Sequence, residues 1–195
     1  MSPRGVATPD VRERLFAAAE RVVDRDGPGA LTSRAVTTEA GCAKGLLHAH
    51  FEGLDEFVAE LCLDRFARTA VKARALPGLA GQGTVARNLD SVVLALFESG
   101  GPALSGLAMT RPAAASRVRA ALEGGAPGFT AIEEAVTGYL EAEQGLGRVA
   151  ATVDPGTAAL AIVGTAHHLL MTSRPGTADP RAAMTRLVAA LVHAE

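Results

Sequence analysis

Two pairs of histidines are the residues whose chemistry first suggests a site: His48 with His50, and His167 with His168. Imidazoles on one helix bind the same metal ion only when they share a face, which needs a spacing of about three or four residues. Neither pair has that spacing, and no acidic residue or cysteine stands in helical register with the second pair. We therefore expect no metal site. His167 and His168 either line a pocket or pack at a helix contact.

The patterns that would indicate catalysis are also weak. No serine stands in the G-x-S-x-G context of an activated nucleophile. The glycine-rich stretch 78–83 lacks a lysine and follows a helical pattern, unlike a phosphate-binding loop, which follows a strand. Glu133 and Glu134 are adjacent, so their carboxylates face different directions. We expect a protein that is not an enzyme and that uses no cofactor.

Composition favours a helical chain inside the cell. Of 195 residues, 48% are hydrophobic and only 4% aromatic, so the apolar mass is mostly alanine, valine and leucine. Such a composition favours helices over sheets and excludes disorder along the whole chain. Two cysteines without a secretion signal fit a reduced, cytoplasmic protein.

Charge and hydropathy point to no particular partner. The formal net charge is −2, and residues 1–75 hold 11 Lys and Arg against 11 Asp and Glu. This balance does not indicate a nucleic-acid partner. The stretch 155–173 is free of charged residues, but its glycines and histidines are typical of a buried helix. We expect no membrane span.

Apolar residues recur at helical spacing through most of the chain, and strand alternation is nowhere strong. The spacing predicts an all-α fold of about nine helices. The stretch 77–83 breaks the pattern and is either a linker or a loop. Helices are expected near residues 11–26, 32–40, 43–50, 54–74, 85–96, 103–122 (as two short helices) and 132–140, and directly after Asp154 and Asp179.

The first three expected helices have the proportions of a helix-turn-helix unit. Gly41 supplies the left-handed backbone that the tight turn needs. In such a unit the second helix braces against the DNA backbone and the third enters the major groove. Four apolar side chains are expected to hold this pair against the first helix: Val36, Ala40, Leu47 and Phe51.

Residues from about Thr8 to Leu61 resemble the TetR family of transcriptional regulators. The remaining residues match that family only in helix layout. The resemblance implies a DNA-binding domain over residues 8–72 and a ligand-binding and dimerisation domain over residues 73–195. It rests on five features in order: the Gly27 turn, the Thr32 cap, the Ala40-Gly41 turn, the Lys44-Gly45 opening of the recognition helix, and His50-Phe51 at its close.

The resemblance also implies a function. We expect a repressor that a small-molecule effector releases from a double-stranded operator. Because residues 155–173 carry no charge, we expect a largely apolar or neutral effector. The alternative is a helical small-molecule-binding or scaffold protein whose DNA binding is weakened.

Position by position, the resemblance places ten residues at the DNA surface. Arginine and lysine neutralise phosphates there, and hydroxyls near a helix N-terminus bind them. The ten residues are Thr32, Ser33, Arg34, Ala43, Lys44, Gly45, Leu46, His48, Ala49 and His50.

The sequence departs from the family pattern at four positions. His48 stands where the family usually has a tyrosine, and Leu54 where it usually has a lysine. Ala43 replaces a serine or threonine cap, and Thr37 replaces a small alanine at the helix crossing. Losing phosphate contacts weakens electrostatic binding. The departures therefore predict weaker DNA binding than in relatives.

The second domain is expected to hold an effector pocket and a dimer interface. Two helices from each subunit would form a four-helix bundle, and a symmetric dimer reads a near-palindromic operator. The effector residues are expected to be Phe97, Leu104, Met109, Phe129, Tyr139, His167 and Met171. The interface residues are expected to be Ala159, Ile162, Val163, Ala166, Leu169, Leu170, Met184, Leu187 and Leu191.

Overall fold

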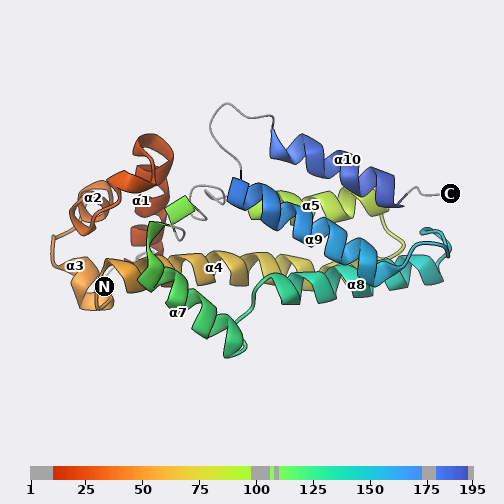
Figure 1. Ribbon diagram of the computed structural model, residues 1–195, viewed down its shortest axis with the longest axis horizontal. Helices are drawn as coiled ribbons and strands as arrows, with labels where there is room; N and C mark the ends of the chain where they lie inside the picture. The colour runs from red at the N-terminus through yellow and green to blue at the C-terminus, as the bar shows by residue number, and fades with distance from the viewer. Residues whose placement is uncertain (1–10, 98–105, 108–109, 173–178, 193–195) are drawn as a thin grey trace, which may run out of the picture.

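The computed structural model describes residues 11–97, 106–107, 110–172 and 179–192. The regular elements among these residues are all helical, and none is a strand. One long helix runs along the molecule, with three short helices packed at one of its ends and a helical body at the other (Figure 1). The predicted all-α fold is confirmed.

Three helices form the N-terminal head: α1 (Val11–Asp26), α2 (Ser33–Glu39) and α3 (Leu46–His50). Their order agrees with the predicted helix-turn-helix. The third helix begins later than the predicted residue 43, because Lys44 and Gly45 form a turn. Neither Ala43 nor Gly45 has a side-chain oxygen that could cap an earlier start.

The predicted start and turn signals of the head are confirmed. The backbone N–H of Ala35 donates to Thr32 Oγ1 at 3.0 Å, so Thr32 caps α2. Gly27 and Gly41 have φ angles of +82° and +62°. These values lie in the left-handed region that side chains other than glycine rarely adopt. Both turns therefore depend on glycine.

The head has a hydrophobic core of its own, which the predicted packing residues join. Val36 and Leu47 are fully buried and Phe51 nearly so, whereas Ala40 is half-buried. Two residues from beyond the first domain also lie in this core: Leu107 and Ala114. The head is therefore closed partly by a segment that comes much later in the chain.

Helix α4 (Leu54–Arg74) belongs to both parts of the molecule. Its first half contributes Phe57 and Leu61 to the core of the head, and its second half contributes Ala70 and Ala73 to the core of the body. One continuous helix thus connects the two cores.

The break at residues 77–83 is a loop rather than a linker. It opens with a 3-10 turn (Leu76–Leu79), and Leu76 is buried in the core of the body. The chain then continues directly into α5 (Val85–Phe97). Because Leu76 anchors this loop, the two sides of the break belong to one packed unit.

The body consists of α5, α7 (Pro112–Glu123), α8 (Phe129–Gly145), α9 (Pro155–Thr172) and α10 (Pro180–Val192). Helix α9 packs closely on α8, and α10 packs on α5. Helix α7 differs from the others, because it lies against α4 near the head (Figure 1).

The shared start signal of the last two helices is confirmed. The backbone N–H of Thr157 donates to Asp154 Oδ1 at 2.7 Å, and that of Arg181 donates to Asp179 Oδ1 at 2.9 Å. These hydrogen bonds cap α9 and α10. Within the described part of the chain, no helix has the length and apolar character that a membrane crossing requires.

Candidate nucleic-acid interface

The ten predicted DNA-contact residues lie together on α2, on α3 and in the turn that joins them. Ser33 and Leu46 are half-buried, and the other eight are exposed. Tertiary structure thus leaves the predicted surface open to a partner.

Contacts with α1 hold α2 in place. Arg21 and Arg25 both bind the carboxylate of Glu39, at 2.8 and 2.9 Å. These hydrogen bonds lower the pKa of Glu39. Arg14 donates to the backbone carbonyl of Ala40 at 3.1 Å. Three of the arginines of α1 are therefore used to position α2.

Aromatic packing anchors α3 from below. The ring of Phe51, directly after α3, lies 5.9 Å from the ring of Phe16 and 5.0 Å from that of Phe57. The Arg12 guanidinium lies 4.8 Å from the centre of the Phe51 ring and pairs with Glu60. Leu47 and Phe51 therefore point inward, which turns the rest of this short helix toward solvent.

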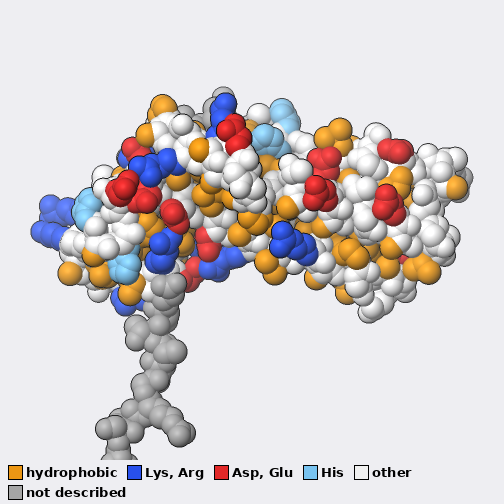
Figure 2. Space-filling view, turned by 90° about the horizontal axis from the view of Figure 1, so that it is seen from below, with side chains coloured by type: hydrophobic (Ala, Val, Ile, Leu, Met, Phe, Trp, Pro, Cys, Tyr) orange, Lys and Arg blue, Asp and Glu red, His pale blue; other side chains and the backbone are white. Residues whose placement is uncertain are grey.

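Two cations remain available at this surface. Arg34 and Lys44 are exposed, and neither side chain forms a hydrogen bond or ion pair with another residue that the structure describes. Lys, Arg and His side chains gather at the end of the molecule where α2 and α3 lie, on the left of Figure 2. Such side chains neutralise backbone phosphates.

Two of the four departures from the family pattern have local explanations. The Thr37 hydroxyl is buried and donates to the carbonyl of Ser33 at 2.9 Å, so it needs no other partner. Leu54 packs against the core of the head.

At Gly45, a Cβ atom would meet no heavy atom within 4 Å, so its backbone is open to close approach.

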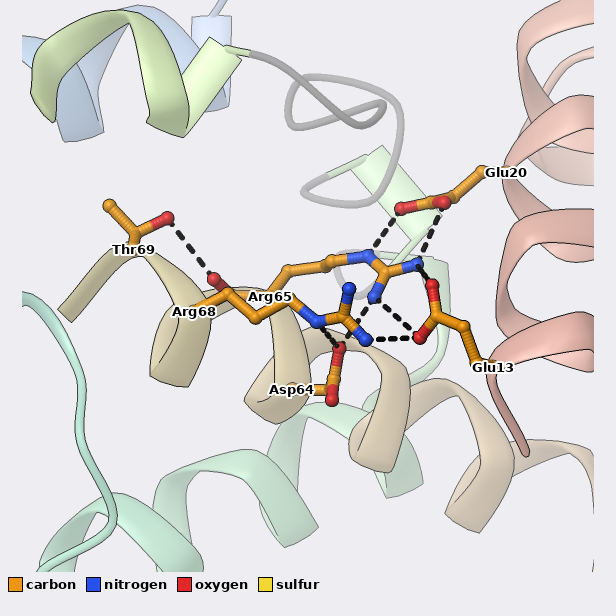
Figure 3. Close-up of polar contacts among 6 residues, drawn as sticks. All are labelled: Glu13, Glu20, Asp64, Arg65, Arg68 and Thr69. Atoms are coloured by element: carbon orange, nitrogen blue, oxygen red, sulfur yellow. Dashed lines mark hydrogen bonds and ion pairs between the residues drawn. The ribbon is translucent and has the colours of Figure 1, made fainter. Parts of the chain in front are cut away.

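An arginine at the joint between head and body binds two elements together (Figure 3). Arg65 of α4 donates to Glu20 at 2.6 and 2.9 Å and to Glu13 at 3.3 and 3.4 Å. Its guanidinium also lies 5.8 Å from the ring centre of Phe16. Because Glu13, Phe16 and Glu20 belong to α1, this one side chain fixes the position of α1 on α4.

Helix α7 makes a second connection between body and head. Arg111, at its N-terminus, binds Asp55 at 2.6 Å, and Arg117 binds Glu52 at 2.9 Å. Asp55 and Glu52 stand just after α3. With Ala114 in the core of the head, α7 contacts the segment that supports the recognition helix.

An open cleft of about 420 Å³ lies beside this joint. Its lining includes Phe16 of α1, Leu63 of α4, and the turn residues Ala126 and Pro127. The charged groups around it are largely engaged with one another, as the Arg12–Glu60 pair shows. None of the predicted effector residues lines this cleft.

Comparison with known proteins identifies the N-terminal segment. Residues 15–61 match the family described as bacterial regulatory proteins, tetR family. This N-terminal segment therefore belongs to that family. The match covers α2, α3 and the first part of α4, so the TetR head contains every predicted DNA-contact residue. Among curated proteins, no relative was found.

Solved structures of TetR-family regulators share the fold of the whole chain. A regulator from Mesorhizobium loti superposes with a TM-score of 0.70 at 15% identity, over 96% of both chains. The fatty acid degradation regulator FadR from Bacillus halodurans gives 0.63 at 17% identity, over 98% of this chain and 97% of that one. FadR from Bacillus subtilis, solved in complex with stearoyl-CoA, gives 0.62 at 15% identity, over 93% and 97%.

The predicted effector residues differ in how deeply the structure buries them. Phe97 and Tyr139 are buried in the core of the body, Phe129 is half-buried, and His167 and Met171 are exposed. The remaining two, Leu104 and Met109, lie outside the described residues.

Helices α4, α8 and α9 meet at an aromatic cluster. The Phe129 ring lies 4.7 Å from the ring of His167 and 5.0 Å from that of Phe66. Phe66, from α4, was missed by the sequence prediction, because its neighbours come from helices far along the chain. Among the described residues, neither His167 nor any other His, Cys, Asp or Glu belongs to a group that could hold a metal ion.

Tyr139 has a structural role that the sequence did not indicate. Its hydroxyl donates to Glu143 Oε1 at 2.7 Å and accepts from Asn88 Nδ2 at 2.9 Å. Both Tyr139 and Glu143 are fully buried. Because its hydroxyl is already used within the chain, Tyr139 ties α8 to α5 rather than facing an open pocket. This corrects its predicted role at the effector site.

Alkaline titration is expected to detect this burial. Desolvation, together with the hydrogen bond to Glu143, raises the pKa of Tyr139 to about 12, above the usual value of about 10. The stability gained from this raised pKa is complete below about pH 10 and is lost as the pH rises through about 12. Tyr139 is the only tyrosine, and there is no tryptophan, so ultraviolet absorbance follows this group alone. A midpoint near pH 10 in the native chain would contradict the buried hydrogen bond; the urea-unfolded chain serves as the reference.

The predicted dimer residues need correction, because the sequence indicated the wrong helix faces. Three of the nine, Leu169, Leu187 and Leu191, are half-buried. The other six pack in the core of their own chain and have no surface left for a partner. These are Ala159, Ile162, Val163, Ala166, Leu170 and Met184.

Proposed function

We propose that this TetR-family chain is a dimeric transcriptional repressor that a small, largely apolar or neutral effector releases from a near-palindromic operator. One observation carries the proposal. Within the part of the chain that the structure describes, the side chains of Arg34 and Lys44 lie exposed and without partners, on a helix-turn-helix whose other arginines are used to position it. An unpaired cation at a surface of this geometry fits a phosphate group.

In this proposal the ten surface residues have two roles. Arg34 and Lys44 neutralise phosphates, and the hydroxyls of Thr32 and Ser33 donate to phosphate oxygens. The open backbone at Gly45 allows the turn to approach the groove closely. The α3 residues Leu46, His48, Ala49 and His50 form the face that enters the groove, where side chains meet base edges and the phosphates that flank them.

The proposed domains are residues 8–72 for DNA binding and residues 73–195 for effector binding and dimerisation. Two separate hydrophobic cores support this division. Leu107 and Ala114 belong to the core of the head, so the second domain also supports the first.

The proposed dimer uses the faces that α9 and α10 leave open. On α9, an apolar stripe follows helical spacing through Leu160, Gly164, His168 and Met171. Leu160 is 57% exposed and Met171 is 41% exposed, which is unusual for large apolar side chains. The small Gly164 between them permits close helix approach. Two copies joined through this stripe form the four-helix bundle.

For the effector, we propose the junction of α4, α8 and α9 around Phe66, Phe129 and His167. Aromatic side chains with one polar group are typical of small-molecule sites. The B. subtilis FadR, a protein of the same fold, was solved with stearoyl-CoA, so this fold can hold a ligand with a long apolar chain. A conformational change on effector binding would reach the head by two routes. One is α4 itself, and the other is the ion pairs that Arg111 and Arg117 of α7 form with Asp55 and Glu52.

A gel-shift experiment tests the proposal. The double substitution R34A/K44A is expected to reduce DNA affinity at least about 10-fold, because it removes two phosphate contacts, and to flatten the salt dependence by about two phosphates. The probe is duplex DNA that the full chain selects from a random pool, and the wild type should bind it with two chains per duplex. A matched control is R87A, an exposed arginine of the body, which should leave binding unchanged.

Other outcomes would contradict the proposal. Retained affinity in R34A/K44A would show that DNA contacts a different surface. If no duplex is selected, the chain is better described as a helical ligand-binding or scaffold protein. Adding an apolar compound that raises the melting temperature of the chain should release the bound duplex.

A further inference from the structure

The proposed DNA surface has few permanent charges. Between residues 27 and 51, the fixed cations are Arg34 and Lys44, and the only acidic residue is Glu39. Glu39 faces α1, where two arginines bind it. Half of the groups able to carry positive charge on this surface are therefore imidazoles, those of His48 and His50, and both are exposed.

Neighbouring arginines cannot take over the role of these imidazoles without breaking existing contacts. Arg14 is bound to the carbonyl of Ala40, and the Arg12 guanidinium is held over Phe51 and paired with Glu60. The cationic charge available to DNA thus depends strongly on the protonation of the two histidines.

Each acidic group next to α3 already has a partner. Glu52 binds Arg117, and the Glu56 carboxylate accepts the backbone N–H of Glu52. The nearest fixed cation before α3 is Lys44, which is exposed. No neighbouring carboxylate among the described residues is therefore in contact with either imidazole, so a DNA phosphate would be the anion that each one meets.

The spacing of the two histidines determines how they would act. Residues i and i+2 of a helix point in different directions. His48 and His50 therefore reach different phosphates rather than one shared ligand. Each imidazolium then contributes its own counterion release to binding.

We propose that DNA binding by this chain is linked to protonation of His48 and His50, which bind backbone phosphates as imidazolium cations. This inference rests on the proposed function. Histidine changes charge between about pH 5 and pH 8, and a bound phosphate favours the charged form. By linkage, DNA affinity increases as the pH falls through this range. The chain then binds its operator most tightly in mildly acidic conditions.

Affinity for the selected duplex is measured at about pH 6 and about pH 8 at one salt concentration, and then over a salt series at each pH. The wild type is expected to bind about 10- to 100-fold more tightly at the lower pH, because each imidazole that becomes charged gains a phosphate partner. Its plot of log affinity against log salt should become steeper by about 1 to 2 at that pH.

Two variants assign the effect to these residues. H48Q/H50Q, which removes both imidazoles, should lose the change of affinity and of salt slope with pH. H48K/H50K, which keeps a cation at both positions, should bind with a steep salt slope at either pH. Both positions are exposed, so neither variant changes the core.

Each alternative result has a definite meaning. Wild-type binding that is equal at both pH values overturns the inference and leaves the proposed function standing. A pH dependence that persists in H48Q/H50Q also overturns it, and assigns the titration to other groups. Absence of binding at either pH overturns the proposed function and this inference with it.

Discussion

Replacing Arg65 with methionine is expected to lower the free energy of unfolding by about 3 kcal/mol. The Arg65 side chain is only 13% exposed, and so is that of its partner Glu20. Methionine keeps the unbranched apolar stem of the side chain but leaves Glu20 partly buried without its cation. Breaking a buried ion pair from one side is strongly destabilising because the remaining charge is poorly solvated.

The raised pKa of Arg65 also indicates that the folded state stabilises its charged form. Burial by itself lowers it, but the hydrogen bonds and charges of Glu20 and Glu13 outweigh burial and raise it. The folded state therefore holds the charged guanidinium firmly. Denaturant unfolding at one protein concentration measures the effect, since the stability of a dimer depends on concentration.

Arg68 provides a matched control one helical turn along α4. It pairs with Glu13 and Asp64, but 53% of its side chain is exposed. Arg68→Met is expected to cost less than about 1 kcal/mol, because water screens exposed pairs. A second variant, R65M/E20Q, should recover part of the loss. Equal effects of the substitutions at Arg65 and Arg68 would contradict the proposed importance of burial.

Arg148→Ala is expected to have a similarly large effect, again about 3 kcal/mol. Glu143 is fully buried, and Arg148 Nε lies 3.4 Å from its Oε2. This is ion-pair distance, but Oε2 accepts no hydrogen bond, so the guanidinium charge is its main compensation. Arg148 also donates to the carbonyl of Gly83 at 2.6 Å and so holds the loop before α5. Removing Arg148 therefore leaves the Glu143 carboxylate without its cation and the Gly83 carbonyl without this donor.

Two further variants separate these contributions. R148K keeps the charge but loses the guanidinium that lies near Glu143 and donates to the Gly83 carbonyl, and should cost about 1 kcal/mol. R148A/E143Q removes the buried charge together with its partner, and should be more stable than R148A. Unfolding followed by circular dichroism provides the measurement. If R148A/E143Q is less stable than R148A, the ion pair is not what stabilises this end of the body.

Local signals in the sequence were sufficient for the helices and for the DNA surface. The Thr32 cap, the Gly41 turn and the Asp154-Pro155 start depend on residues within about four positions of one another, so hydrogen-bond geometry alone determines them. The closeness of the ten proposed DNA-contact residues could be predicted for the same reason. They come from one short segment, so their order along the chain already fixes their relative positions.

Residues that act across distant segments could not be predicted in this way. The sequence did not indicate that Arg65 reaches Glu20, that Leu107 enters the core of the head, or that Phe66 meets Phe129. On α9 the hydrophobic spacing identified an apolar helix, but apolar residues on every side of it left the choice of face open. The prediction placed Ile162 at the dimer interface, whereas packing against α8 buries it in the body.

The sequence by itself determined the helical class and the boundaries of most helices, since each depends on neighbours along the chain. The residues proposed to contact DNA stay a prediction, although their short segment already placed them close together. Tertiary structure decided which cations remain unpaired, because Arg14, Arg21 and Arg25 find their partners only when α1 packs on α2. That packing leaves Arg34, Lys44 and two histidines facing solvent. A near-neutral head can thus present a positive surface, because most of its carboxylates pair with arginines away from that surface.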